Sequence, residues 1–221
     1  MTAITKNFYS LILVTNKGTQ PLERYLNFIA KCAKGGITSV QLREKTLTPK
    51  ELEHFSFKLK NLLDIYQIPL IVNDNIELSA KLNANGVHLG QSDTSITKAR
   101  AILGPNKIIG LSVNTIEQVQ NSNNQPVDYI GVGTIFPTNN KNDVQTIWGL
   151  DNLKQASLIA SHPIVAIGGI DQTNAASVIA NGADGIAAIG AFHSIKDPFA
   201  ASQNLIQIIK NAEVNNNAKS I

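Results

Sequence analysis

The chain repeats one pattern along its length: a short apolar run, followed by a longer segment with the apolar spacing of an amphipathic helix. Short runs rich in Ile, Val and Leu are typical of parallel strands that are covered by helices. The runs occupy residues 9–14, 39–42, 70–72, 86–89, 107–111, 129–132, 164–167 and 185–189. Strict alternation predicts a parallel α/β fold, and eight units in this length predict a closed (β/α)8 TIM barrel. A doubly wound open sheet is the alternative that periodicity does not exclude.

The segments between the runs carry helix signals. Thr48, Pro49 and Glu51 make a capping box with proline in the first turn, and a Gly-Gly pair at 35–36 ends the preceding helix. Helices are expected at residues 22–34, from 48 onward, and at 76–82, 95–103, 115–119, 150–160, 172–180 and 198–211, with further caps at Thr94, Asn114 and Asp171. No linker interrupts the series, so residues 1–212 are expected to form one catalytic barrel domain. Residues 213–221, which are rich in Asn, are expected to form a disordered tail.

Composition and charge restrict the classes of partner. The 221 residues are enough for one barrel-sized domain, and a hydrophobic share of 43% allows a sizeable core. The net charge of +3 comes from scattered Lys and Arg, which favours anionic small molecules and gives no indication of nucleic acid. The single cysteine, Cys32, excludes an internal disulfide, and no membrane span or signal peptide is evident. A cytoplasmic protein without a membrane partner is expected, and its oligomeric state is open, a homo-oligomer included.

Polar and glycine residues gather just after the apolar runs, where the carboxyl ends of barrel strands build active sites. Alternation along the second run turns Val40 and Leu42 toward the helices, and Gln41 and Arg43 toward the barrel interior. A buried arginine needs an anion, which is either a ligand phosphate or an internal partner such as Glu44. The other positions of this kind are Lys45, Asn73, Asp74, Gly90, Gln91, Asp93, Ser112, Asn114, residues 133–141, Gly168, Gly169 and Gly190.

Asp74 and Asp93 follow consecutive strands, which lie about 5 Å apart in a sheet. Two carboxylates this close repel each other unless a cation lies between them. Oxygen ligands with few other protein groups suit Mg²⁺, which keeps waters and binds substrate phosphates. The alternative is that each aspartate caps the helix after it. With Arg43, Lys45 and Lys141 in neighbouring segments, we favour a site for Mg²⁺ and a diphosphate.

The glycines and histidines give weaker evidence for a functional site than the aspartates and Arg43 do. The pair Gly168-Gly169 and the later Gly190 fit the phosphate site of barrels, where backbone N–H groups bind a phosphate; a tight turn is the alternative for the pair. The four histidines lack metal-ligand spacing, and no nucleophile stands in an evident triad, so no histidine is assigned to catalysis. We interpret His88, in the fourth run, as a core or supporting residue.

Seven segments together resemble the thiamine-phosphate synthase family. Their order and spacing cover nearly the whole chain, which makes the resemblance more specific than any single motif. The segments are Gln41-Leu42-Arg43-Glu44-Lys45, Val72-Asn73-Asp74, Gly86-Val87-His88-Leu89-Gly90-Gln91-Ser92-Asp93, Gly110-Leu111-Ser112, Tyr129-Ile130-Gly131-Val132-Gly133 through Ile135-Phe136-Pro137-Thr138 to Lys141, Val165-Ala166-Ile167-Gly168-Gly169-Ile170, and Gly182-Ala183-Asp184-Gly185.

The resemblance implies a transferase that condenses 4-amino-2-methyl-5-hydroxymethylpyrimidine diphosphate with 4-methyl-5-(2-hydroxyethyl)thiazole phosphate, giving thiamine phosphate and pyrophosphate. The displacement would be dissociative, assisted by one Mg²⁺ per subunit on the diphosphate, with Asp74 and Asp93 as metal ligands. The implied contacts to the pyrimidine diphosphate are Gln41, Arg43, Lys45, Asn73, Ser112 and Lys141, of which Arg43, Lys45, Ser112 and Lys141 would serve catalysis. The implied contacts to the thiazole phosphate are Thr138, Asn139, Asn140, Gly169, Ile189 and Gly190.

Departures from the family pattern concern the thiazole side. Asn139 and Asn140 follow Thr138 where relatives often have other residues, Asn114 stands where His is common, and Gly190 stands where Ser is common. The alternatives are a thiazole tautomerase of the same barrel family, a phosphosugar epimerase, and a barrel that binds thiamine precursors without catalysis. The segment Gln91-Ser92-Asp93 and the segment from Pro137 to Lys141 favour the synthase over the tautomerase.

Overall fold

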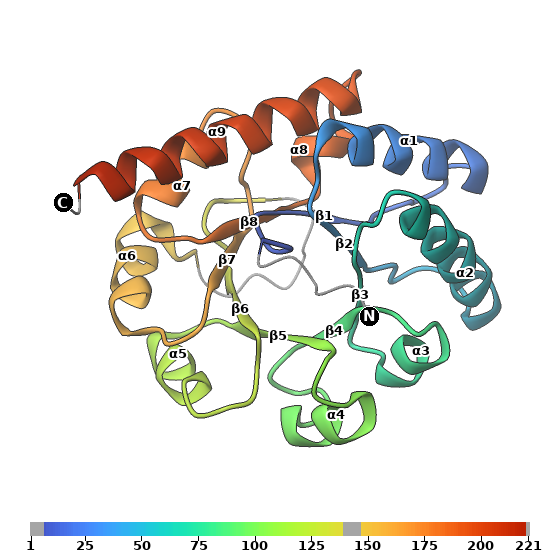
Figure 1. Ribbon diagram of the computed structural model, residues 1–221, viewed down its shortest axis with the longest axis horizontal. Coiled ribbons are helices and arrows are strands. Elements are labelled where there is room, and N and C mark those ends of the chain that lie inside the picture. The colour runs from blue at the N-terminus through green and yellow to red at the C-terminus, as the bar shows by residue number, and fades with distance from the viewer. Residues whose placement is uncertain (1–6, 139–146, 220–221) are drawn as a thin grey trace.

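The computed structural model describes residues 7–138 and 147–219 and confirms the predicted TIM barrel. Within these ranges eight parallel strands form one closed sheet in chain order (Figure 1). Because β8 pairs with β1, the open-sheet alternative is excluded. The strands are β1 (Leu11–Val14), β2 (Ser39–Leu42), β3 (Leu70–Asn73), β4 (Gly86–Leu89), β5 (Ile108–Val113), β6 (Tyr129–Gly133), β7 (Ile164–Ile167) and β8 (Gly185–Ala188).

Helices surround the strands on the outside of the barrel (Figure 1). In the described ranges they are α1 (Leu22–Gly35), α2 (Pro49–Ile65), α3 (Ile76–Lys81), α4 (Ile96–Leu103), α5 (Ile116–Ser122), α6 (Gly149–Ile159), α7 (Ala175–Ala180), α8 (Gly190–His193) and α9 (Pro198–Lys219). The last helix, α9, packs against both α1 and α7 and covers the junction between the first and last strands. None of these helices is both long and apolar enough to cross a lipid bilayer.

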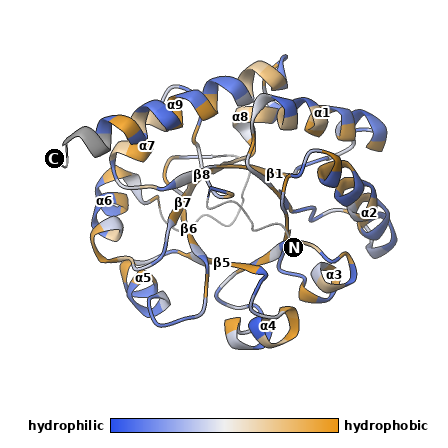
Figure 2. Ribbon diagram, in the orientation of Figure 1, coloured by the Kyte–Doolittle hydropathy of each residue, from blue (hydrophilic) through white to orange (hydrophobic). Residues whose placement is uncertain are grey.

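Side chains alternate along each strand and so build two separate cores. Val40 and Leu42 of β2 pack in the layer between the strands and the helices, as predicted. Ile12, Val14 and Tyr129 belong to a smaller cluster inside the barrel. Figure 2 shows the hydrophobic residues on the strands and on the helix faces turned toward them, with hydrophilic residues on the outer faces. The apolar runs of the sequence are therefore strands buried on both sides.

Two helix signals in the sequence are confirmed. The Thr48 hydroxyl accepts a hydrogen bond from the Glu51 backbone N–H, the Glu51 side chain closes the capping box, and Pro49 opens α2. Helix α1 ends at Gly35, and Gly36 follows with a φ of 105°, a left-handed conformation that glycine adopts at little cost.

The predicted caps Thr94, Asn114 and Asp171 are wrong, because the N-caps are Ser95, Thr115 and Asn174. The first two caps are misplaced by one residue, since Ser95 and Thr115 cap a helix as well as the predicted Thr94 and Asn114 would. Asp171 instead closes a turn before α7, where its carboxylate accepts from Thr173.

Two further differences lie near the carboxyl terminus. The sequence did not predict α8, because four residues are too few for a helical period to be recognised. The structure also continues α9 to Lys219, so residues 213–219 are helical where the sequence analysis expects a disordered tail.

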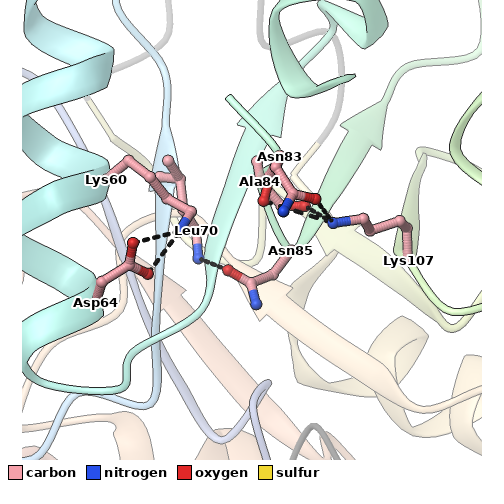
Figure 3. A network of polar contacts seen from close by, with 7 residues as sticks. All are labelled: Lys60, Asp64, Leu70, Asn83, Ala84, Asn85 and Lys107. Carbon is pink, nitrogen blue, oxygen red and sulfur yellow. Dashed lines mark hydrogen bonds and ion pairs between the residues drawn. The ribbon is translucent and has the colours of Figure 1, made fainter. Parts of the chain in front are cut away.

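A network of side chains joins the elements at the amino ends of β3, β4 and β5 (Figure 3). The Asn85 side chain accepts from the Leu70 backbone N–H at 2.9 Å, and the Lys107 ammonium donates to the Ala84 carbonyl at 2.6 Å. On α2, Lys60 forms an ion pair with Asp64 one turn later. Contacts of this kind fix the register of the strands and leave the opposite, carboxyl end for a site.

Candidate active site

A cavity of about 490 Å³ lies at the carboxyl end of the barrel. Its floor reaches Ile12 and Tyr129 inside the barrel, and its rim includes Arg43 and Thr138 from the loops after β2 and β6. The volume is that of a small-molecule site. The prediction that the carboxyl ends of the strands build the functional face agrees with this position.

A chain of amide and carboxyl groups runs from the buried interior to the rim. The Gln41 amide donates to the Asn73 side-chain oxygen at 3.2 Å, and the Asn73 amide donates to Asp74 Oδ2 at 2.6 Å. The carboxyl of Asp74 is hydrogen-bonded to that of Asp93. Asp93 Oδ2 in turn accepts from the Gly90 backbone N–H at 2.7 Å. Residues at the carboxyl ends of β2, β3 and β4 are thus linked into one polar array.

The two aspartates do not cap the helices that follow them. Asn75 caps α3 and Ser95 caps α4, each through its side-chain oxygen. Asp74 has a φ of 62°, a left-handed conformation that Asp and Asn tolerate better than most residues. The structure therefore confirms that the carboxyls of Asp74 and Asp93 meet, and it excludes the capping alternative for both.

The pKa of Asp74 reflects its burial and its contact with Asp93. Partial burial raises the pKa of Asp74 to about 6, with further contributions from the hydrogen bond and negative charge of Asp93. The positive charges of Lys45 and Arg43 act in the opposite direction on the same pKa. Asp74 therefore holds its proton to a higher pH than an ordinary aspartate, and a divalent cation between the two carboxyls would favour its ionised form.

Arg43 lines the cavity, as the alternation along β2 predicts. Its guanidinium has no ion-pair partner among the residues that the structure describes. Glu44 is not the internal partner, because its carboxylate accepts instead from the Lys17 backbone N–H at 2.9 and 3.1 Å. The Arg43 backbone N–H is held by the Thr15 hydroxyl at 2.9 Å. Arg43 is therefore a half-exposed cation at the cavity, available to an anionic ligand.

The glycine pair after β7 is required by its backbone. Gly168 and Gly169 have φ values of 104° and 63°, which disfavour other residues. A Cβ on Gly169 would also lie 2.6 Å from the Pro137 carbonyl oxygen, and one on Gly168 would lie 2.4 Å from the Thr134 side chain. Both glycines line the cavity, so the tight turn and a phosphate contact are compatible there.

The cavity wall after β8 is formed by Ile189 and Gly190, where α8 begins. The His193 ring fixes this short helix, because its Nδ1 lies 2.8 Å from the Ile189 carbonyl and its Nε2 lies 2.8 Å from the Tyr25 hydroxyl. The Tyr25 hydroxyl also accepts from the Asn16 backbone N–H. Side chains and backbone from three segments thereby hold the β8 end in place.

The sequence analysis missed a hydrogen-bonded chain inside the barrel. His88 Nδ1 lies 2.8 Å from the Tyr129 hydroxyl, and His88 Nε2 lies 2.8 Å from the Ser112 hydroxyl at the cavity wall. Both ring nitrogens of His88 have hydroxyl partners and neither is bonded to a carboxylate of the described residues, so the arrangement is not that of a catalytic triad. Strand alternation was the available signal, because it places His88, Ser112 and Tyr129 on interior faces.

Comparison with known proteins decides the family. Residues 11–192 match the model described as thiamine monophosphate synthase. The chain belongs to this family. A thiamine-phosphate synthase of Chlamydia abortus is 50% identical over 204 residues, which are 92% of this chain and 96% of that relative. A thiamine-phosphate synthase of Vibrio campbellii is 40% identical over 204 residues, covering 92% of this chain and 100% of the relative.

A solved structure supports membership of the thiamine monophosphate synthase family. The thiamine phosphate pyrophosphorylase of Pyrococcus furiosus superposes with a TM-score of 0.83 at 31% identity. The match covers 94% of this chain and 98% of that one. The family resemblance predicted from the sequence is therefore confirmed by sequence and by structure.

The predicted site residues of this family member fall into three groups. The group that lines the cavity consists of Gln41, Arg43, Asn73, Ser112, Thr138, Gly169, Ile189 and Gly190. Lys45, Asp74 and Asp93 form a second group, joined to that lining through the polar array and through the charge that Lys45 exerts on Asp74. Asn139, Asn140 and Lys141 lie outside the described residues.

Proposed function

We propose that the chain is a thiamine-phosphate synthase, a transferase that joins the pyrimidine diphosphate to the thiazole phosphate and releases pyrophosphate. The observation that carries this proposal is the contact between Asp74 and Asp93, with Arg43 and Lys45 beside them, at the carboxyl end of the barrel. Two acids and two cations at one rim match the needs of a metal-bound diphosphate. The names and identities of the relatives from C. abortus and V. campbellii support the same activity.

The acid pair fits a magnesium ion. Its two carboxyls are close enough to be hydrogen-bonded to each other while Asp74 is protonated, and they repel each other once it ionises unless a cation lies between them. Hard oxygen donors with room for waters suit Mg²⁺ better than softer metals. When bound by Asp74 and Asp93, Mg²⁺ would supply charge neutralisation to the diphosphate. The Asn73 amide would keep the Asp74 carboxylate oriented toward that position.

Gln41, Arg43, Lys45, Asn73, Ser112 and Lys141 are the proposed contacts of the pyrimidine diphosphate. Arg43 would hold the phosphates from the cavity wall, because its guanidinium can form paired hydrogen bonds to phosphate oxygens. Lys45, which is exposed, would approach from the rim. For the thiazole phosphate, Thr138, Asn139, Asn140, Gly169, Ile189 and Gly190 are the proposed contacts.

The reaction requires the protein to stabilise the charge of the leaving group and to position the two substrates. The C–O bond to the diphosphate breaks, its electron pair leaves with pyrophosphate, and the thiazole nitrogen forms the new C–N bond. That nitrogen is already a nucleophile, so the protein need only hold the two substrates in line. Arg43, Lys45 and Lys141 would offset the charge that develops on the departing group.

Purified protein supplied with both substrates and Mg²⁺ tests the proposal by release of pyrophosphate and appearance of thiamine phosphate. Asp93→Asn should lower turnover by about a hundredfold, because it removes a charged group that acts in the transition state. Asp64→Asn is the matched control: it removes an aspartate from the opposite end of the barrel (Figure 3) and should stay within about twofold of wild type, since it breaks only an exposed ion pair.

The outcomes separate the alternatives. Proton exchange on the thiazole without pyrophosphate release would identify a tautomerase, and substrate binding without any turnover would identify a carrier barrel. Either result would refute the synthase proposal. As the biological setting we propose a cytoplasmic enzyme whose partners are its phosphorylated substrates, with no nucleic acid or membrane partner.

A further inference from the structure

Three side chains from adjacent strands form a hydrogen-bonded relay inside the barrel. Tyr129 of β6 lies at the buried end, His88 of β4 in the middle, and Ser112 of β5 at the cavity wall. Tyr129 is 1% exposed and His88 is 9% exposed, whereas Ser112 is partly exposed. The relay therefore connects a fully buried phenol to a hydroxyl that faces the cavity.

Two glycines leave the space that the relay occupies. A Cβ on Gly110 would lie 2.2 Å from Tyr129 Cζ and 2.5 Å from His88 Nδ1. A Cβ on Gly131 would lie 2.9 Å from His88 Cε1. Both glycines stand in strand interiors, where glycine weakens a sheet and often marks a close approach. Their presence in β5 and β6 is explained by the two rings.

The buried Tyr129 hydroxyl determines which groups donate and which accept in the relay. His88 Nδ1 is the hydrogen-bond partner of the Tyr129 hydroxyl within the described ranges, so a Tyr129 that did not donate to it would leave a buried O–H unpaired, which is costly. Nδ1 must then accept, and a neutral imidazole carries its one proton on the other nitrogen. His88 Nε2–H therefore donates to Ser112 Oγ, and the proton of Ser112 is left for an acceptor in the cavity.

The ring stays neutral at ordinary pH. His88 is only 9% exposed, and burial disfavours the charged form of an imidazole. A protonated ring would put a second N–H against the Tyr129 hydroxyl and reverse the bond that the phenol makes. Neutrality keeps the relay in one arrangement.

We propose that Tyr129 and His88 are positioning residues that hold the Ser112 hydroxyl as a hydrogen-bond donor to a ligand oxygen in the cavity. The ligand oxygen belongs to the diphosphate of the pyrimidine substrate, so this inference rests on the proposed function. Ser112 consequently does not act as a base, because its proton points to the ligand and its oxygen already accepts from His88.

The first test reads the tautomer directly and needs no substrate. In protein labelled with ¹⁵N-histidine, the two ring nitrogens of a neutral imidazole have well-separated chemical shifts, and His88→Gln identifies the His88 signals. We expect the proton on Nε2 in the wild type. A proton on Nδ1, or a protonated ring at pH 7, would overturn the proposal even if the protein is fully active.

The second test is a double-mutant cycle on turnover. Tyr129→Phe, which removes only the hydroxyl, should lower kcat by about three- to tenfold, the effect of one neutral hydrogen bond. In a Ser112→Ala background the same change should alter kcat by less than about twofold, because Tyr129 acts through the serine. Tyr9→Phe, which removes a phenol hydroxyl beside the same interior cluster, is the control. Equal effects of Tyr129→Phe in both backgrounds would assign it a merely structural role.

The two tests keep this inference separate from the proposed function. An inactive wild type with the Nε2–H tautomer would refute the synthase and leave the relay standing. An active wild type with independent effects of Tyr129 and Ser112 would refute the relay alone. If Tyr129→Phe does not fold, the tautomer in the wild type decides.

Discussion

Asp74→Asn is expected to make the metal-free protein more stable while it makes the enzyme inactive. In the wild type, the raised pKa of Asp74 means that the folded state holds this proton more tightly than the unfolded state does. Stability from this group is present below about pH 4 and is lost as the pH rises through about 6. At pH 8 the folded protein therefore bears the whole cost of an ionised Asp74 that is partly buried and faces Asp93, and asparagine removes it.

The expected gain in stability follows from the change in the pKa of Asp74. A pKa moved from 3.8 to about 6 corresponds to at most about 3 kcal/mol, at 1.4 kcal/mol per unit. More than a third of Asp74 is exposed, so solvent screening reduces this to about 1 kcal/mol. For a chain of this length that is a rise in Tm of about 2–4 °C. Asparagine also tolerates the left-handed backbone at this position, so the substitution adds no strain of its own.

Thermal unfolding in EDTA at pH 8, repeated toward pH 5, checks the prediction. The gain in Tm for Asp74→Asn should shrink as the pH falls, because the wild-type carboxyl then takes up its proton. The Asp64→Asn control should instead be slightly less stable, since it loses the pair with Lys60. In the activity assay with Mg²⁺, Asp74→Asn should fall by about a hundredfold. A variant that is no more stable than wild type at pH 8, or that keeps near-wild-type turnover, would refute the reasoning.

Other perturbations test the remaining parts of the site. Lys141→Ala should lower kcat by about a hundredfold in the pyrophosphate assay if its charge stabilises the leaving group, and a change below about threefold would contradict that role. Gly169→Ala should lower both Tm and activity, because its φ is 63° and the new methyl group would meet the Pro137 carbonyl; an unchanged melting curve would argue against that clash. Gly190→Ser should lower KM for the thiazole phosphate by about three- to tenfold by adding one hydrogen bond, and an unchanged KM would place the phosphate elsewhere. Cys32 should resist iodoacetamide at pH 8 in the folded protein, because burial raises its pKa to about 12; rapid alkylation without unfolding would contradict this.

The residues that sequence reasoning placed well are those whose position depends on the strand to which they belong. Alternation along β2 is sufficient to turn Arg43 into the cavity, and the order of β3 and β4 is sufficient to bring Asp74 against Asp93. His88 was interpreted only as a core or supporting residue, because its contacts come from Ser112 and Tyr129, which are 24 and 41 residues away. A local pattern gives no information on whether two interior side chains at such separations reach each other.

The ends of several helices were predicted wrongly for a different reason. Thr94 and Ser95 are both good N-caps, and only the path of the chain out of β4 decides between them. Helix α8 is too short to show a period, and it is held by the His193 contacts to Tyr25 and Ile189 rather than by its own sequence. Helix α9 continues past the predicted boundary through residues with modest helix propensity. Helix α9 packs against α1 and α7, and such tertiary contacts stabilise a helix more than propensity does.

Charged side chains have partners from the chain at the amino end of the barrel, whereas several described residues at the carboxyl end form no ion pair. This difference indicates that the functional site lies at the carboxyl end. At the amino end, Lys107 donates to Asn83 and Ala84, and Lys60 pairs with Asp64, so both of these cations have a partner from the chain itself (Figure 3). At the carboxyl end, Arg43 has no ion-pair partner among the described residues, and two carboxyls face each other at the expense of stability. A fold selected for stability alone would neutralise these groups, as it does at the other end. A ligand that brings its own anion and cation would compensate the charges of both signs in this polar array, and the magnesium diphosphate proposed above is such a ligand.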